Sequence, residues 1–260
     1  MFWRLGVIGS PIEHSLSPRL HEAGLSLAGL QGRSERYRMV ESDSPRLAAM
    51  MGAEVDALSV TMPMKAPAAA LCDRLDDRSR ELGVVSSLLW RDGLLWGATF
   101  DGEGLCDYLL ASFAFEMAHA HVVVVGSGGA ARAIVAALVS GGAQSVSVLG
   151  RNAATVDEIV ARHFNVYPEM QLYRPVDLII NTTPAPGRAA ESAVMQGVTR
   201  DSVAVDITYD PRRSPWLGTY EEFGCHVANG LGMLAYQAAR QMNWWWGTHI
   251  DGADLLAVIT

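Results

Sequence analysis

Residues 122–134 read VVVVGSGGAARAI, and this stretch decides the fold. Four consecutive valines, Val122–Val125, are typical of a strand that is buried on both faces of a parallel sheet. Glycines follow at positions 126, 128 and 129, and an alanine-rich helical pattern runs over Ala130–Val139. The sequence therefore predicts a strand, a glycine turn and a helix in direct succession.

This order is what a dinucleotide site requires. Gly126 would allow the tight turn, and Gly128 would let the backbone approach a pyrophosphate. Ala131, at the third position of the glycine pattern, is small enough for close packing of the helix on the strand. The free N–H groups at the start of the helix would face the anion. An ordinary tight turn between a strand and a helix is the alternative.

The composition indicates a compact soluble protein, and the cysteine usage indicates the cytoplasm. The 260 residues suffice for one large or two ordinary domains, and half of them are hydrophobic. A net charge of −8 argues against nucleic acid and anionic membranes as general partners. Three dispersed cysteines, Cys72, Cys106 and Cys225, show no metal-ligand spacing and read as reduced thiols, so we expect no metal. We see no signal peptide and no apolar run that would cross a bilayer.

The first hundred residues mix both element types. We expect strands over 4–9, 37–40, 57–60, 84–90 and 94–100, the last two joined by a hairpin at Arg91-Asp92-Gly93. We expect helices over 17–28, 44–52 and 66–82, the first with Ser17 as N-cap and Pro18 at its first position. In the third helix, the solvent-exposed face would carry Asp73, Asp76 and Asp77.

The pattern changes near residue 102. A helix over 103–118 precedes a second run, with strands over 122–125, 146–149, 177–181 and 203–207, a helix over 153–163 and a last helix over 230–247. Strands that alternate with helices imply right-handed crossovers and a parallel sheet.

Four side chains outside the glycine turn could carry chemistry. Lys65 follows a strand in a stretch poor in charge, where partial desolvation would lower the pKa of an ammonium group and suit it to acid–base work. A surface lysine is the plainer interpretation. Asp101 could pair with Lys65 or simply cap the next helix. Ser15 and Ser17 could converge on a carboxylate, whereas helix capping alone would also explain Ser17.

Seven motifs then occur in an order that resembles the shikimate dehydrogenase family. They are GVIGSPIEHSLSP, SVTMPMK, FDGEG, VVVVGSGGAAR, LIINTTP, VDITYDPRRSPWL and NGLGMLAYQAA, and they span roughly residues 5–247. The resemblance implies an α/β substrate domain over 1–102, completed by a C-terminal helix over 231–260. It implies an NADP-binding Rossmann domain over 103–230. Members of the family occur as monomers and dimers.

The resemblance also implies roles for individual residues. The family reaction is reversible hydride transfer between a nicotinamide and a ring carbon of a hydroxylated cyclohexene carboxylate. Lys65 matches the residue that exchanges the proton, and Asp101 matches its partner. The expected substrate-binding residues are Ser15, Ser17, Thr61, Ser86, Thr99, Tyr209 and Gln237. The expected cofactor-binding residues are Gly126, Ser127, Gly128, Gly129, Ala130, Arg151, Asn181, Thr182 and Gly230.

Three asparagines of the family pattern are missing. Ser59, Ser86 and Thr99 stand in their places, and the asparagines at the last two positions hydrogen-bond the ring hydroxyls in the family. A serine offers one hydroxyl in place of a two-ended amide, and each group left unpaired costs about 1–3 kcal/mol. We therefore hypothesise that the chemistry is kept while the preferred substrate moves, with quinate, an amino-substituted shikimate analogue or another ring acid as candidates.

Arg151 indicates the cofactor. It stands at the end of the predicted second strand of the Rossmann domain, where an arginine suits the extra phosphate of NADP and an acid would suit NAD. The family's second arginine is absent, since Thr155 and Val156 occupy that position, so use of NAD stays open.

Two other functions compete with this interpretation. A folate-linked methylene dehydrogenase shares the two-domain plan, but no tyrosine stands close before Lys65. A non-catalytic nucleotide-binding module would have no need of the pair Lys65 and Asp101. We expect the run Trp244–Trp246 to be core or a surface patch rather than a ligand site.

Overall fold

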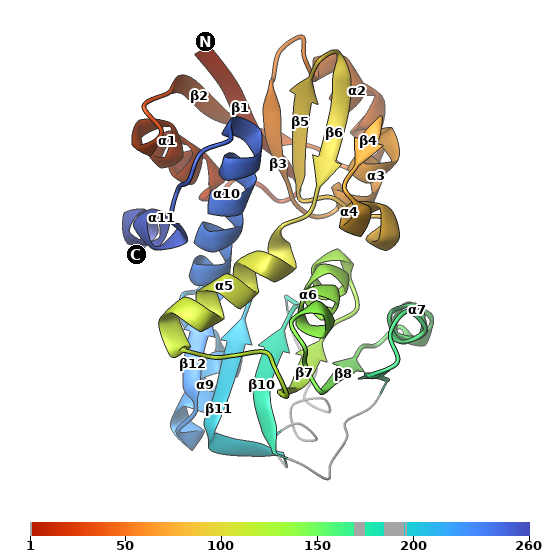
Figure 1. Cartoon of the computed structure of the whole chain (residues 1–260), viewed down its shortest axis with the longest axis vertical. Helices are drawn as coiled ribbons and strands as arrows, with labels where there is room; N and C mark the ends of the chain where they lie inside the picture. The colour runs from red at the N-terminus through yellow and green to blue at the C-terminus, as the bar shows by residue number, and fades with distance from the viewer. Residues whose placement is uncertain (1, 169–174, 185–194, 196) are drawn as a thin grey trace. The chain divides into compact units, whose positions relative to one another are not determined.

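The computed structural model describes residues 2–168, 175–184, 195 and 197–260. The chain forms two compact units, one of Met1–Gly104 with Leu234–Thr260 and one of Leu105–Met233 (Figure 1). Both units are of the α/β class, and the C-terminal helical segment belongs to the same unit as the N-terminus, as the sequence predicts. Within the described ranges, no helix combines the length and the apolarity that a bilayer crossing needs.

The first unit is a mixed sheet in the strand order β2-β1-β3-β5-β6-β4. Its described strands are β1 (Phe2–Gly9), β2 (Gln31–Arg38), β3 (Ala57–Val60), β4 (Arg74–Leu75), β5 (Ser87–Arg91) and β6 (Leu94–Ala98). β1 pairs in parallel with β2 and β3, whereas β5 is antiparallel to β3 and β6. Asp92 and Gly93 have positive φ between β5 and β6, which suits the two-residue hairpin that the sequence predicts.

Helices cover both faces of this sheet. They are α1 (Ser17–Leu27), the 3-10 turn η1 (Glu41–Asp43), α2 (Ser44–Met50), α3 (Lys65–Leu71), α4 (Asp77–Leu82), most of α10 (Gly230–Trp246), and α11 (Gly252–Ile259). Alternation along β3 divides the two faces: Leu58 and Val60 pack in the core formed with α2 and α3, while Ser59 bonds side chains of α1 and α10. Figure 1 shows α1, α10 and α11 on one side and α2, α3 and α4 on the other.

The single helix expected over 66–82 is wrong, because the chain leaves the helix after Leu71 and forms β4 before α4. Asp73 pairs with Leu95 of β6: its N–H donates to the Leu95 oxygen, and its carboxylate accepts from the Leu95 N–H. Asp76 then caps α4 by accepting the Ser79 N–H at 2.8 Å. Asp73 and Asp76, expected on the solvent-exposed face of one helix, therefore lie between two helices, where Asp73 bonds β6 and Asp76 caps α4.

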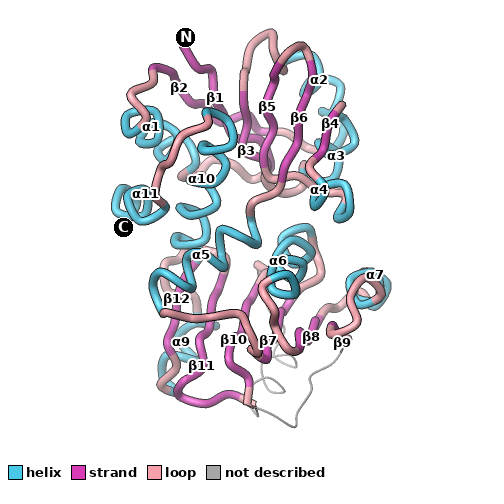
Figure 2. The backbone as a smooth tube through the Cα atoms, viewed as in Figure 1, coloured by secondary structure: helices cyan, strands magenta, loops and turns pink. Residues whose placement is uncertain are grey.

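The second unit is a parallel sheet in the order β12-β11-β10-β7-β8-β9. Its described strands are β7 (His121–Val125), β8 (Ser145–Leu149), β9 (Val166–Tyr167), β10 (Val176–Asn181), β11 (Val198–Asp206) and β12 (His226–Asn229). Its helices are α6 (Gly129–Ser140), α7 (Ala153–Val160), α9 (Pro215–Phe223) and most of α5 (Asp101–Phe113). Counting from β7, this is the doubly wound order of dinucleotide-binding domains, with the reversal between β7 and β10 (Figure 2).

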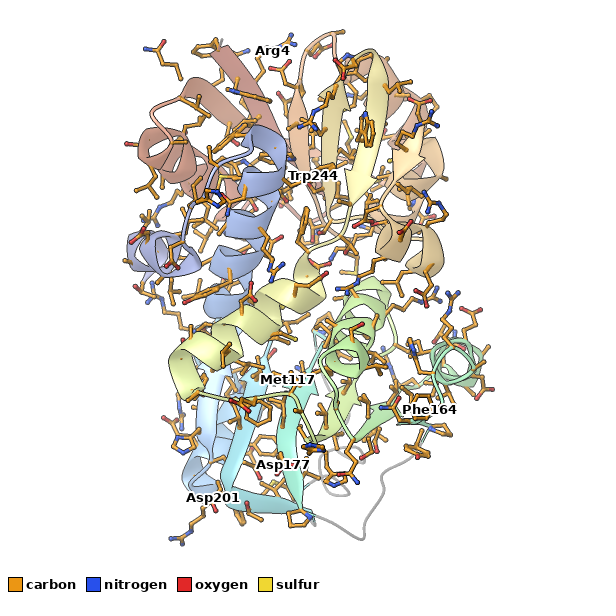
Figure 3. The ribbon with its side chains drawn as sticks, in the orientation of Figure 1. Arg4, Met117, Phe164, Asp177, Asp201 and Trp244 are labelled. Carbon is orange, nitrogen blue, oxygen red and sulfur yellow. The ribbon has the colours of Figure 1, made fainter. Side chains whose placement is uncertain are left out.

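The valine run is buried on both faces, as predicted. Val122 and Val124 pack in the core that contains α6, whereas Val123 and Val125 pack with Trp216 of α9. Elements that the sequence did not predict are β4, β9, β12, η1, α9 and α11, and β2 begins earlier than the strand expected over 37–40. Phe164, before β9, is 94% exposed and points away from the sheet (Figure 3).

Candidate active site

Lys65 and Asp101 form an ion pair although 36 positions separate them in the chain. Lys65 Nζ lies 2.5 Å from Asp101 Oδ2, and their side chains are only 15% and 8% exposed. Each residue opens a helix, Lys65 at α3 and Asp101 at α5. Lys65 is therefore not a solvated surface lysine. An ammonium group has three donors, so the bond to Asp101 leaves others for a bound oxygen.

The two serines expected to bind a carboxylate lie together at the start of α1. Ser15 Oγ donates to Ser17 Oγ at 3.3 Å, and Ser17 is buried. Arg36 of β2 holds this loop with two hydrogen bonds to the Ser15 carbonyl oxygen. The expected N-cap is wrong: Leu16 occupies that position, and the first helical N–H, that of Ser17, donates to Ser15 Oγ at 3.3 Å. The Ser17 hydroxyl is thus not used for capping, and the positive end of the helix dipole lies beside both serines.

Thr61 follows β3 and packs against Gly9 at the end of β1. A Cβ at Gly9, where φ is +153°, would collide with Thr61 Cγ2 and approach the Met62 oxygen to 2.7 Å. The glycine lets the ends of the two strands lie this close. It therefore helps to place Thr61.

Gln237 lies on α10, buried, and its amide donates to the Leu234 oxygen at 3.2 Å. A Cβ at Gly104 would come within 2.5 Å of the Gln237 nitrogen. The first turn of α5, which begins at Asp101, therefore packs directly on the backbone of α10. Sequence reasoning missed this role of Gly104, although the glycine stands in the quoted FDGEG motif.

Ser86 and Thr99, which stand where the family pattern has asparagines, are both buried. Ser86 Oγ accepts the Phe100 N–H at 2.9 Å, so part of its capacity is already used. Thr99 is 1% exposed, and its hydroxyl has no hydrogen-bond partner among the described residues. The Phe100 ring lies 5.8 Å from the ring of Trp244 on α10 (Figure 3). An aromatic pair thus stands beside Asp101.

Acidic and basic groups near Asp101 are also partly buried. Glu103, in the first turn of α5, pairs with Arg78 of α4. Burial raises the pKa of Glu103 above its usual value, and the charges of Arg78 and Arg240 oppose that shift.

The glycine turn of the second unit fits a dinucleotide phosphate. Gly126 has φ +120°, and a Cβ there would collide with Thr182 Oγ1. Thr182 in turn donates its N–H and its hydroxyl to the Val125 oxygen, each at 2.8 Å. A Cβ at Gly128 would meet nothing within 4 Å, so open space adjoins the start of α6. Gly129 and Ala130 begin that helix, where free N–H groups suit an anion.

Arg151, after β8, is exposed and has no bonded partner in the part of the chain that the structure describes. No acid stands at that strand end. Thr155, which replaces the family's second arginine, bonds Ser127 Oγ at 2.6 Å and so ties α7 to the glycine turn. This set of donors fits the 2′-phosphate of NADP better than the free hydroxyl of NAD.

The remaining predicted residues lie in the second unit and shape its strand ends. Asn181 is 1% exposed, and its amide bonds Asp206 and the backbone of Thr183. Gly230 opens α10 and donates its N–H to the Thr208 oxygen at 2.9 Å. Tyr209 follows β11 and is half-buried. Within the described ranges, no three His, Cys, Asp or Glu side chains gather as metal ligands would.

Comparisons with known proteins agree with this geometry. Residues 7–88 match the model of the shikimate dehydrogenase substrate binding domain, and residues 109–213 match that of shikimate / quinate 5-dehydrogenase. The chain is 35% identical over 250 residues to a shikimate dehydrogenase (NADP(+)) of an Exiguobacterium species, covering 95% of this chain and 94% of the relative. The chain belongs to the shikimate dehydrogenase family.

Solved structures share the architecture of this chain. The shikimate dehydrogenase of Thermus thermophilus, solved with NADP(H) and shikimate, matches with a TM-score of 0.86 and 28% identity over 98% of each chain. A 5-ketofructose reductase of Gluconobacter matches with a TM-score of 0.84 and 24% identity, covering 100% of this chain and 98% of that one. The second likeness concerns the fold alone, and a fold does not fix a substrate.

Proposed function

We propose that this protein is an NADP-dependent oxidoreductase that interconverts a shikimate-like ring acid and its 3-keto form. The buried pair of Lys65 and Asp101 carries this proposal, because a sensor without turnover would not need a lysine held 2.5 Å from a carboxylate. Family membership supplies the reaction class, and relatives of the chain are named as NADP(+)-dependent.

The chain's own residues would handle the proton. In the oxidative direction Lys65 in its neutral amine form would accept the hydroxyl proton as the ring carbon gives up its hydride and the carbonyl forms, and in the reductive direction the Lys65 ammonium would return that proton. Asp101 orients the amine and balances its charge. Ser15 and Ser17, at the start of α1, would hold the ring carboxylate. Thr61 and Gln237 would contact the rest of the ring.

When bound, NADP supplies the hydride acceptor or donor. Its pyrophosphate would lie against the turn 126–130, where Gly128 leaves open space and Gly126 with Thr182 shapes the backbone. Arg151 would hold the 2′-phosphate. Asn181 and Gly230 would contribute by holding the neighbouring strand ends rather than through free polar groups.

A preference for a ring acid other than shikimate is the second candidate. It is favoured by Ser86, whose hydroxyl already accepts the Phe100 N–H, and by the unpartnered hydroxyl of Thr99. Neither side chain offers the paired donor and acceptor of an asparagine. Quinate and amino-substituted shikimate are the analogues to compare.

The experiment is a turnover panel followed by the absorbance of the reduced nicotinamide. Wild type and Lys65→Ala are assayed side by side with NADP and NAD against shikimate, quinate and amino-substituted analogues. We expect NADP-linked turnover that Lys65→Ala removes. Shikimate as best substrate by orders of magnitude would reject the second candidate. Cofactor binding without turnover of any ring acid would instead favour the nucleotide-binding module.

A further inference from the structure

A buried polar cluster joins three elements of the first unit. His21 of α1, Ser59 of β3 and Gln241 of α10 are 0%, 6% and 0% exposed. Ser59 Oγ lies 2.9 Å from His21 Nε2 and accepts from Gln241 Nε2 at 2.7 Å. His21 Nδ1 lies 2.7 Å from Ser34 Oγ on β2. We call His21, Ser59 and Gln241 the polar triad.

Each member of the triad is tied by spacing to an expected substrate-binding residue. His21 lies one helical turn after Ser17, and Gln241 lies one turn after Gln237, so each pair shares a helix face. Ser59 precedes Thr61 by two positions, the repeat of a strand face. The three elements that carry the proposed substrate contacts are therefore linked at a single buried point.

The contacts fit a neutral imidazole. His21 Nε2 faces the Ser59 hydroxyl and, at 3.4 Å, the Gln241 amide nitrogen, which suits a tautomer with its proton on Nδ1 and Ser34 as the acceptor. Gln241 Oε1 has no hydrogen-bond partner among the described residues. Burial lowers the pKa of His21 to about 3, which keeps the ring neutral. His21 is thus not a proton donor to the reaction, and the proposed mechanism assigns it no role.

Aromatic packing completes the cluster. The Trp245 ring meets His21 edge-on at 5.2 Å, and its indole N–H donates to Ser87 Oγ on β5 at 2.9 Å. Apolar side chains of similar volume could fill this space without directional bonds. A directional cluster also fixes the rotation of α1 and α10 about their axes, which non-directional packing leaves freer.

We propose that His21 is a positioning residue, which acts through Ser59 and Gln241 to set α1, β3 and α10 so that Ser17, Thr61 and Gln237 converge on one substrate. This role rests on the proposed function. It predicts that loss of the triad weakens ring-acid binding while the proton-transfer pair of Lys65 and Asp101 keeps its geometry.

The test compares His21→Phe, which keeps a ring but removes its hydrogen bonds, with His21→Gln, whose amide replaces the bond at the Nε2 side. Ser59→Ala removes the central hydroxyl with a smaller change of shape. Leu20→Val, at a fully buried neighbour on α1, is the control for lost stability alone. Each variant is measured for kcat, for KM of the ring acid and of NADP, for melting temperature, and for shikimate binding by calorimetry.

We expect His21→Phe and Ser59→Ala to raise the ring-acid KM and Kd about tenfold, with kcat within about threefold and the NADP KM unchanged. His21→Gln should keep most of the wild-type affinity. A double variant that combines His21→Phe with Ser59→Ala should be no worse than the worse single one, since both changes break one cluster. Leu20→Val lowers the melting temperature alone.

Two failures can be told apart. An unchanged shikimate Kd in folded Ser59→Ala and His21→Phe, or an equal rise of that Kd in Leu20→Val, would overturn the positioning role alone. A wild type that neither binds nor turns over any ring acid would overturn the proposed function, and the positioning role with it.

Discussion

Strands β7 and β3 both end at turns that carry expected site residues, yet they are built in different ways. β7 is apolar on both faces, and the turn after it offers backbone N–H groups and glycines. β3 is apolar on one face only, and on the other Ser59 enters a buried cluster with His21 and Gln241. The proposed cofactor turn thus consists of backbone groups, whereas the proposed substrate site depends on side chains from distant segments.

The largest effect is expected at the side-chain site. Lys65→Met keeps the apolar stem and removes the amine, so kcat should fall by about 10²–10⁴-fold, the usual share of acid–base catalysis. Asp101→Asn should cost less, because it keeps an oxygen near Nζ. Steady-state kinetics with the preferred ring acid measures both. Binding of NADP by either variant should match the wild type, and weakened NADP binding would break the separation of the two sites.

The glycine turn should respond to backbone changes according to local space. Gly126→Ala places a Cβ against Thr182 at φ +120°, and the strain should cost about 1–3 kcal/mol of unfolding free energy. At Gly128 an added Cβ has no neighbour within 4 Å, so Gly128→Ala should leave the free energy of unfolding unchanged. The same Cβ would occupy the space proposed for the pyrophosphate, so the affinity for NADP should fall. Urea unfolding and NADP titration measure the two quantities. A Gly128→Ala protein that binds NADP normally would show that the open space is not the phosphate site.

Acid should expose the buried imidazole of the first unit. The pKa of His21 is lowered from 6.5 to about 3 by burial, so between these values the unfolded chain binds a proton that the folded chain excludes. Above pH 6.5, His21 is neutral in both states and does not alter the free energy of unfolding. As the pH falls from 6.5 toward 3, the free energy of unfolding decreases by about 1.4 kcal/mol per pH unit. Between pH 6.5 and pH 3, the free energy of unfolding should fall more steeply with pH for the wild type than for His21→Phe, as measured by urea unfolding at each pH. An equal pH dependence in the two proteins would contradict a buried neutral His21.

The smallest effect is expected at the exposed rim of the cofactor site. Arg151→Ala should raise the KM of NADP about tenfold, near 1.4 kcal/mol, and leave the KM of NAD unchanged, because only NADP carries the 2′-phosphate. The ratio of kcat/KM for the two cofactors measures this. An equal change for both would place Arg151 outside the phosphate site.

The sequence predicted best what depends on neighbouring residues. The valine run, the glycine turn and the hairpin at Asp92-Gly93 each need only local spacing and local backbone freedom, and all three formed as expected. The helix over 66–82 failed because Asp73 pairs with Leu95, a partner that no local pattern announces. The N-cap at Ser17 failed for a local reason, since the helix begins one residue earlier than expected and the Ser17 hydroxyl meets Ser15.

By itself, the sequence determined the α/β class, the dinucleotide turn and, through seven ordered motifs, the family, because these depend on residue type and short spacing. Only the tertiary structure decided that Lys65 and Asp101 meet at 2.5 Å, that Gly104 lets α5 pack on α10, and that His21 is tied to Ser59 and Gln241. Those contacts join segments far apart in the chain. Their geometry is set by how the sheet and helices pack, which residue spacing does not record.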